Sequence, residues 1–311
     1  MSMETERWSR FKPKSNKARF LSLGSTGLAF QLSEHIVVKK VRPGREADLD
    51  RERSIFRLLG RHPPSPYIVQ AFYQTDDAIF LECAQKGDLA SLLRQFQERD
   101  ESGRRVVQVT RRPPWADCLR WIKQLGAAAA WLETLGLAHC DIRPGNMLLF
   151  ASGDTKLADF DRALRVGDPL LSGTEPFARL LGREGGTDAG TYGRAGARSE
   201  QFAVGSVLYS LARGHDPFED EWWGYDHGPI RRDKLQRMEF PAVGDLACAE
   251  VIRGCWHGRH RSMADLSAAL ARLDEEPWEV TCEADPTWKE ARARECEAVA
   301  ASGLLGELSW I

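Results

Sequence analysis

The sequence lacks any long hydrophobic run: no stretch of its 311 residues approaches the ~20 apolar residues that a membrane-spanning helix needs. The first residues also lack the apolar core of a secretion signal, so we expect neither a leader nor membrane contact. Charge of one sign is not in excess, because 43 basic residues stand against 45 acidic ones. The resulting net charge of −2 gives no reason to expect nucleic acid as a partner.

Paired cysteines are absent from the sequence as well. The seven cysteines, at positions 83, 118, 140, 248, 255, 282 and 296, form no CxxC pair and no zinc-ligand spacing. Scattered cysteines in odd number are typical of reduced, buried thiols inside a cell. We therefore expect a protein of the cytoplasm or the nucleus.

What is present indicates a globular chain of two unequal parts, with 42% hydrophobic and 28% charged residues. Residues 20–41 alternate as strand, turn, strand, turn, strand, residues 46–59 have a helical pattern, and residues 79–81 form a short apolar strand. Beyond them the pattern is mainly helical. A strand-rich first third followed by a helix-rich remainder predicts an α+β fold with two lobes.

Several further elements are expected in the helix-rich part and beyond it. We predict helices over 88–97, 201–211 and 286–301, and a long helix whose apolar face runs from Trp121 to Leu135. We also predict a hairpin that joins 146–150 to 155–160. Residues 97–114 are polar and end in prolines, which indicates an exposed insertion. The first nineteen residues form a basic arm.

The most informative stretch is HCDIRPGN, His139 to Asn146, followed by Asp159 in the triplet Asp-Phe-Asp. Aspartate and asparagine often cap turns, and this explains each residue singly. It does not explain a histidine, an aspartate, a proline, an asparagine and a second aspartate in this order.

With this stretch, the order and spacing of six motifs over residues 20–272 resemble the eukaryotic-type protein kinase family. The resemblance implies a bilobal fold with a β-rich small lobe and a mainly helical large lobe. It implies that Asp141 orients the substrate hydroxyl and accepts its proton, that Arg143 lies near the transferred phosphate, and that Asn146 and Asp159 bind magnesium. A basic residue two positions after the aspartate resembles the serine/threonine branch.

The resemblance also implies ATP as the cofactor together with Mg²⁺. Its phosphate loop would include Gly24 and Gly27, and Lys39 would bind phosphates while Glu52 holds it, although Lys40 is a competing candidate. The adenine would bind backbone groups of Glu82 and Ala84, and Asp88 would lie near the ribose. The expected divisions are a basic arm (1–19), a small lobe with hinge (20–84), a large lobe (85–272) and a helical tail (273–311).

The sequence departs from the family pattern at several places. Ser22 replaces a loop glycine, Cys140 replaces an arginine that pairs with phosphorylated loops in many relatives, and Asp161 replaces the glycine of Asp-Phe-Gly. Glu200 replaces an aspartate of the central helix, and no Ala-Pro-Glu triplet follows the loop 162–198.

Three functions therefore stay open. The first is a serine/threonine-type protein kinase that transfers phosphate from Mg–ATP to protein substrates, and the second is a pseudokinase that binds nucleotide or acts as a scaffold. The third is a small-molecule phosphotransferase, whose metal motif is closer to Asp-Phe-Asp. Pro144 and the segment 199–218 argue against the third.

Overall fold

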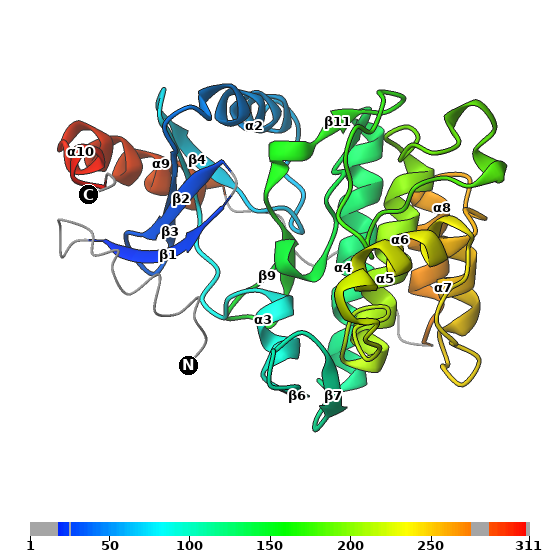
Figure 1. The fold of residues 1–311 in the computed structure, drawn as a ribbon. Coiled ribbons are helices and arrows are strands. Elements are labelled where there is room, and N and C mark those ends of the chain that lie inside the picture. Colours follow the sequence, from blue (N-terminus) through cyan, green and yellow to red (C-terminus); the bar gives the residue numbers. More distant parts are fainter. Residues whose placement is uncertain (1–17, 25, 275–285, 309–311) are drawn as a thin grey trace. The chain divides into compact units, whose positions relative to one another are not determined.

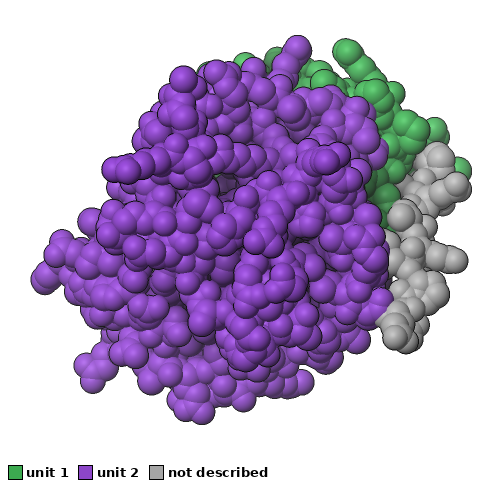
Figure 2. Space-filling model, turned by 90° about the vertical axis from the view of Figure 1, so that its right-hand side faces the viewer, with its two compact units in different colours: residues 1–85, 281–311 green, residues 86–280 purple. Residues whose placement is uncertain are grey.

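The computed structural model describes residues 18–24, 26–274 and 286–308. The chain divides into two compact units, which we call the first unit (residues 1–85 and 281–311) and the second unit (residues 86–280; Figure 2). The first unit is built on a β-sheet and the second is mainly helical (Figure 1), which confirms the predicted α+β class. Within the described ranges, no helix has both the length and the apolar character needed to cross a bilayer.

The first unit contains a five-stranded antiparallel sheet with the order β1-β2-β3-β5-β4. Its strands are β1 (Arg19–Leu23), β2 (Gly27–Gln31), β3 (Ile36–Val41), β4 (Ala71–Gln74) and β5 (Ala78–Glu82). Its helices are α2 (Glu46–Leu59), α9 (Pro286–Ala301) and α10 (Leu304–Glu307). The helices predicted over 46–59 and 286–301 are thus confirmed at both ends.

The C-terminal helices cover one face of this sheet. Cys296, Leu305 and Leu308 are buried in one apolar cluster with strand residues that include Phe30 and Val38. The ring of Trp288 in α9 meets that of Phe72 in β4 at a centroid distance of 5.1 Å. The tail, whose packing the sequence left open, is therefore part of the core of the first unit.

The second unit is organised around two long helices, α4 and α5, which pack on each other and on α8 and α7 (Figure 1). Its helices are α3 (Leu89–Arg94), α4 (Trp115–Thr134), α5 (Ala197–Arg213), α6 (His227–Gln236), α7 (Ala249–Trp256) and α8 (Met263–Ala271). Its strands are β6 (Gln97–Arg99), β7 (Val106–Val109), β8 (Leu137–Ala138), β9 (Met147–Leu149), β10 (Thr155–Leu157) and β11 (Leu164–Arg165). Two short antiparallel pairs, the β9–β10 hairpin and the β8–β11 pair, lie against α4, which contacts β10 and β8.

The segment expected to be an exposed insertion is only partly so. Residues 97–109 form the β6–β7 hairpin, and the helix predicted over 88–97 ends at Arg94. The tip of the hairpin is exposed, but Val106 is buried and its N–H donates to the Glu219 carbonyl at 2.8 Å. The polar composition of the segment concealed the β-branched residues that pair its two strands.

Candidate active site

The loop from His139 to Asn146 is anchored by its histidine, which has no solvent exposure. The Asp141 N–H donates to Nδ1 of His139 at 3.3 Å, so Nε2 carries the proton and donates to the Ala158 carbonyl at 3.0 Å. Burial lowers the pKa of His139, which keeps the ring neutral in this arrangement. The histidine is therefore a structural link between the loop and the Asp-Phe-Asp turn, whose Phe160 ring lies 4.9 Å away.

The carboxylate of Asp141 receives hydrogen bonds from three side chains and is only 7% exposed. Arg143 Nε and Asn146 Nδ2 donate to Oδ2 at 3.1 and 2.9 Å. Thr174 Oγ1 donates to Oδ1 at 2.9 Å. The structure thus brings together the three loop residues that the sequence singled out, and it orients the carboxylate from both sides.

Thr174 is a site residue that sequence reasoning missed. It lies 33 positions after Asp141, in a segment that is rich in Gly, Arg and Asp and has little periodicity. In the sequence, the Gly-Thr pair at 173–174 is the one local feature that could have indicated this contact, but only the fold shows that it lies next to Asp141. Arg162 also approaches this carboxylate, with Nη1 4.0 Å from Oδ1 of Asp141.

Asp159 lies close to Asn146 because β9 and β10 pair, with Met147 opposite Leu157. The Ala158 N–H donates to the Asn146 carbonyl at 2.9 Å, which continues this pairing. The backbone of Asp159 has a φ of 69°, in the left-handed region that costs a non-glycine residue about 1–2 kcal/mol. Such strain is concentrated at functional sites.

These two residues fit a magnesium ion. Mg²⁺ prefers oxygen ligands and takes one or two from protein while water and phosphate supply the others. Asp159 offers a carboxylate, and Asn146 offers its amide oxygen because its amide nitrogen is used toward Asp141. Asp161, which replaces the glycine of Asp-Phe-Gly, brings a second carboxylate to the same turn and is buried there.

Glu200, at the start of α5, anchors the backbone of the loop from His139 to Asn146. Its two carboxylate oxygens accept hydrogen bonds from the backbone N–H groups of His139 and Cys140 at 2.7 and 3.0 Å. Burial raises the pKa of Glu200 to about 7. The longer glutamate therefore supports the loop where the family has an aspartate.

Cys140 is packed in an apolar cluster instead of facing an ionic partner. The cluster contains Ala138, Leu170 and Ala195, with Tyr192 against its edge. Burial raises the pKa of the Cys140 thiol, so it stays protonated and uncharged. The loop segment 162–198 is thus docked here by apolar contacts.

In the first unit, Lys39 and Glu52 form the expected ion pair. Nζ of Lys39 lies 2.7 Å from Oε2 of Glu52, whose side chain has no solvent exposure. Lys40 lies on the opposite face of β3, donates to the Leu305 carbonyl and lies 3.6 Å from Asp77. Because successive side chains of a strand point to opposite faces, only Lys39 meets α2.

The glycine turn that precedes β2 has a structural requirement of its own. A Cβ atom on Gly27 would lie 2.5 Å from the Lys40 carbonyl oxygen, so the sheet itself excludes any side chain there. The Gly24 N–H donates to the Gly27 carbonyl at 2.8 Å and closes the turn. Phosphate binding by Gly24 and Gly27 stays a prediction.

The remaining nucleotide-binding candidates follow β5. The Cys83 N–H, between Glu82 and Ala84, donates to the His35 carbonyl at 2.9 Å and fixes this strand end. Asp88, in the second unit, caps α3 by accepting hydrogen bonds from Ser91 N and Oγ at 2.8 and 2.7 Å. A ribose contact of Asp88 stays a prediction beside this capping role.

Comparison with known proteins agrees with this geometry. A sequence model described as "Protein kinase domain" matches residues 23–262. The chain is 33% identical over 125 residues to a Saccharomyces cerevisiae protein named "Probable serine/threonine-protein kinase" (39% of this chain and 32% of the relative). It is 28% identical over 188 residues to a CBL-interacting serine/threonine-protein kinase of Arabidopsis thaliana (58% and 37%). It is also 28% identical over 202 residues to a serine/threonine-protein kinase of Drosophila melanogaster (62% and 24%).

The matched parts span between about a quarter and two fifths of the length of these curated relatives. The family match covers more than half of the present chain and includes every loop residue that surrounds the Asp141 carboxylate. The chain belongs to the protein kinase family.

Proposed function

We propose that the protein transfers the γ-phosphate of ATP to serine or threonine hydroxyls of proteins. The observation that carries this proposal is the Asp141 carboxylate, which Arg143, Asn146 and Thr174 hold in one orientation. A carboxylate fixed in this way can position a hydroxyl group and accept its proton. The serine/threonine kinases among the relatives support the same choice of acceptor.

The other site residues take the roles that the family assigns. Lys39, held by Glu52, binds the α- and β-phosphates, and Gly24 and Gly27 let the backbone approach them. Backbone groups of Glu82 and Ala84 bind the adenine, Asp88 binds the ribose, and Asn146 and Asp159 hold Mg²⁺. When bound, Mg²⁺ neutralises charge on the phosphate oxygens.

The site of action we propose is the cytoplasm or the nucleus. Of the described residues, the cysteines are free and buried, at positions 83, 118, 140, 248, 255 and 296. Thiols in this state fit a reducing compartment.

The experiment that tests the proposal is transfer of labelled γ-phosphate to a broad protein mixture and to the chain itself. Asp141→Ala should lower the transfer rate by at least about 10²-fold, because the general base is lost, while ATP binding persists. The control is Asp233→Ala, an exposed aspartate of α6 that should leave the rate unchanged. Transfer that survives Asp141→Ala contradicts the assignment.

The same assay separates the two alternatives. ATP binding without transfer to any acceptor indicates a pseudokinase, which the buried Asp161 beside the metal residues favours. Transfer to sugar, choline or aminoglycoside acceptors, but not to proteins, indicates a small-molecule phosphotransferase.

A further inference from the structure

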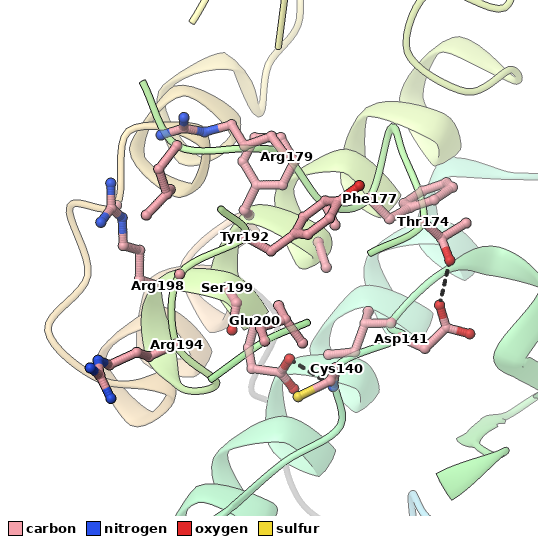
Figure 3. Close-up of a pocket in the computed structure, with 18 of the residues that line it drawn as sticks. Cys140, Asp141, Thr174, Phe177, Arg179, Tyr192, Arg194, Arg198, Ser199 and Glu200 are labelled. Carbon is pink, nitrogen blue, oxygen red and sulfur yellow. Dashed lines mark hydrogen bonds between the residues drawn. The ribbon is translucent and has the colours of Figure 1, made fainter. Parts of the chain in front are cut away.

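A pocket of the second unit opens beside Asp141 and runs beneath the segment 170–199 (Figure 3). Its walls are mainly apolar, with Leu170, Phe177, Leu181 and Tyr192 from the segment and Phe202 from α5. The volume of about 50 Å³ has room for about four water molecules or one small apolar side chain.

Three arginines line the pocket on the side away from Asp141 and Thr174 (Figure 3). The side chains of Arg194 and Arg198 are 61% and 47% exposed, and that of Arg179 is buried. The pocket thus has the acceptor-orienting carboxylate at one end and guanidinium groups at the other.

The carboxylates already present do not balance this charge. Glu184 forms ion pairs with two arginines, at 2.7 Å from Arg179 and 3.6 Å from Arg198. Asp188 lies 3.7 Å from Arg194. One positive charge therefore remains among the five side chains. Long ion pairs between exposed side chains contribute little, so an incoming carboxylate can join or replace them.

Two more arginines lie next to the acceptor position. Arg162 Nη1 lies 3.4 Å from Thr174 Oγ1 and 4.0 Å from Asp141 Oδ1, and Arg143 donates to Oδ2 of the same carboxylate. Two guanidinium groups thus flank one carboxylate, and both are more than a third exposed.

We infer that the substrates are acidic protein segments: the acceptor hydroxyl lies at Asp141, a small apolar side chain enters the pocket, and glutamate or aspartate residues beyond it pair with Arg194 and Arg198. This inference rests on the proposed function, because it names the substrate class of that site. The guanidinium fork binds carboxylates through two parallel hydrogen bonds, whereas a lysine-rich segment meets like charge here.

The test uses serine peptides that carry Glu, Ala or Lys at each of the four positions on either side of the acceptor. At one or more positions the wild-type protein should phosphorylate the Glu peptide with a kcat/KM about five- to tenfold higher than that of the Ala peptide, because glutamate gains ion pairs with the two half-exposed arginines. The Lys peptide should have the lowest kcat/KM, because lysine is repelled by the same arginines. The double variant Arg194→Glu/Arg198→Glu should reverse this order at the same positions, which a purely structural disturbance does not do. Replacement of Arg237, an exposed arginine directly after α6, by alanine (Arg237→Ala) should leave both the rates and the order unchanged.

A preference for Lys peptides, or a Glu preference that the double charge reversal leaves in place, overturns the inference. If the wild-type protein phosphorylates no peptide and no protein, this result contradicts the proposed function instead. In that case fluorescence anisotropy with the same peptides still decides the inference: tighter binding of Glu peptides, reversed in the double variant, supports it, and equal binding refutes it.

Discussion

Glu200 combines two opposing effects at a single carboxyl group. Burial favours its neutral form, and the two backbone N–H groups that it accepts favour the charged form. Burial is the larger effect, and the pKa is raised from 4.5 to about 7. The group is therefore protonated in the folded protein at pH values where the unfolded chain has released this proton.

This difference predicts a pH dependence of stability. Since the folded state binds more protons between pH 4.5 and 7, the free energy of unfolding falls as the pH rises through this window, by up to about 3 kcal/mol from this group. In Glu200→Gln that part of the fall should disappear in denaturant titrations at pH 5, 6, 7 and 8. The surface variant Glu250→Gln should keep the wild-type dependence, and an unchanged fall in Glu200→Gln would disprove the idea.

Thr174 contributes a hydroxyl group to the orientation of Asp141. Thr174→Val keeps the size of the side chain but removes the donor to Oδ1, so we expect kcat to fall by about tenfold or more, because hydrogen bonds to charged groups are worth about 1.5–3 kcal/mol. Thr174→Ser should restore most of the rate. Equal kcat in the valine and serine variants would show that the hydroxyl is not needed.

Among the elements, the segment between β11 and α5, residues 166–196, is held mainly by loop hydrogen bonds and apolar contacts. The Gly167 N–H donates to Ala195 O and the Leu170 N–H to Gly193 O, both at 2.8 Å, and the apolar cluster at Cys140 packs against the same stretch. Two hydroxyl groups of the segment are already engaged, since Tyr192 donates to Glu175 and Thr191 to the Asp188 carbonyl. The docked form of the segment therefore rests on unmodified residues.

We expect transfer that does not depend on phosphorylation of this segment. The exposed Ser172 and Thr187 should tolerate joint replacement by alanine with kcat within about twofold of wild type, as expected for surface positions. Phosphatase treatment should likewise leave the rate unchanged. A collapse of activity in Ser172→Ala/Thr187→Ala that glutamate at these positions restores would contradict the expectation.

The α9 helix is a second element whose tertiary contacts stabilise the unit to which it belongs. Trp288 packs on Phe72, and Lys289 Nζ donates to Gln70 Oε1 at 3.3 Å. Trp288→Ala should lower the free energy of unfolding by about 2–3 kcal/mol, because it removes a large, partly buried ring from the core of the first unit. Thermal unfolding measures this, with the fully exposed Tyr225→Ala as the matched control. An equal midpoint shift in both variants would show that α9 does not support the sheet.

For the whole molecule, ligand binding and stability are linked. Mg–ATP at about 100 times its Kd should stabilise the folded protein by about 2.7 kcal/mol. Excess EDTA should remove the part of this stabilisation that depends on metal. The variant Asp159→Ala should lack that part at every Mg²⁺ concentration, because the Asp159 carboxylate is one of the two protein ligands that we propose for magnesium. A metal-dependent shift that persists in Asp159→Ala would place the ion elsewhere.

Much of the architecture was predictable because local patterns determine it. The helices over 46–59 and 286–301 and the strands within 20–41 follow from periodicity, and β9 and β10 from two short apolar runs around a turn. The hairpin over 97–109 was not predicted, because Val106 in its second strand is buried and its N–H donates to Glu219, more than a hundred residues away in the sequence.

By itself the sequence determined the α+β class and singled out Asp141, Asn146 and Asp159 as candidate site residues, because they lie at fixed spacings within two short loops. Only the tertiary structure decided that Thr174 joins Asp141, that Lys39 and not Lys40 meets Glu52, and that the tail covers the first sheet. The physical reason is the same in each case. These contacts join segments far apart in the chain, and which side chains meet depends on how whole elements pack, not on the residues next to them.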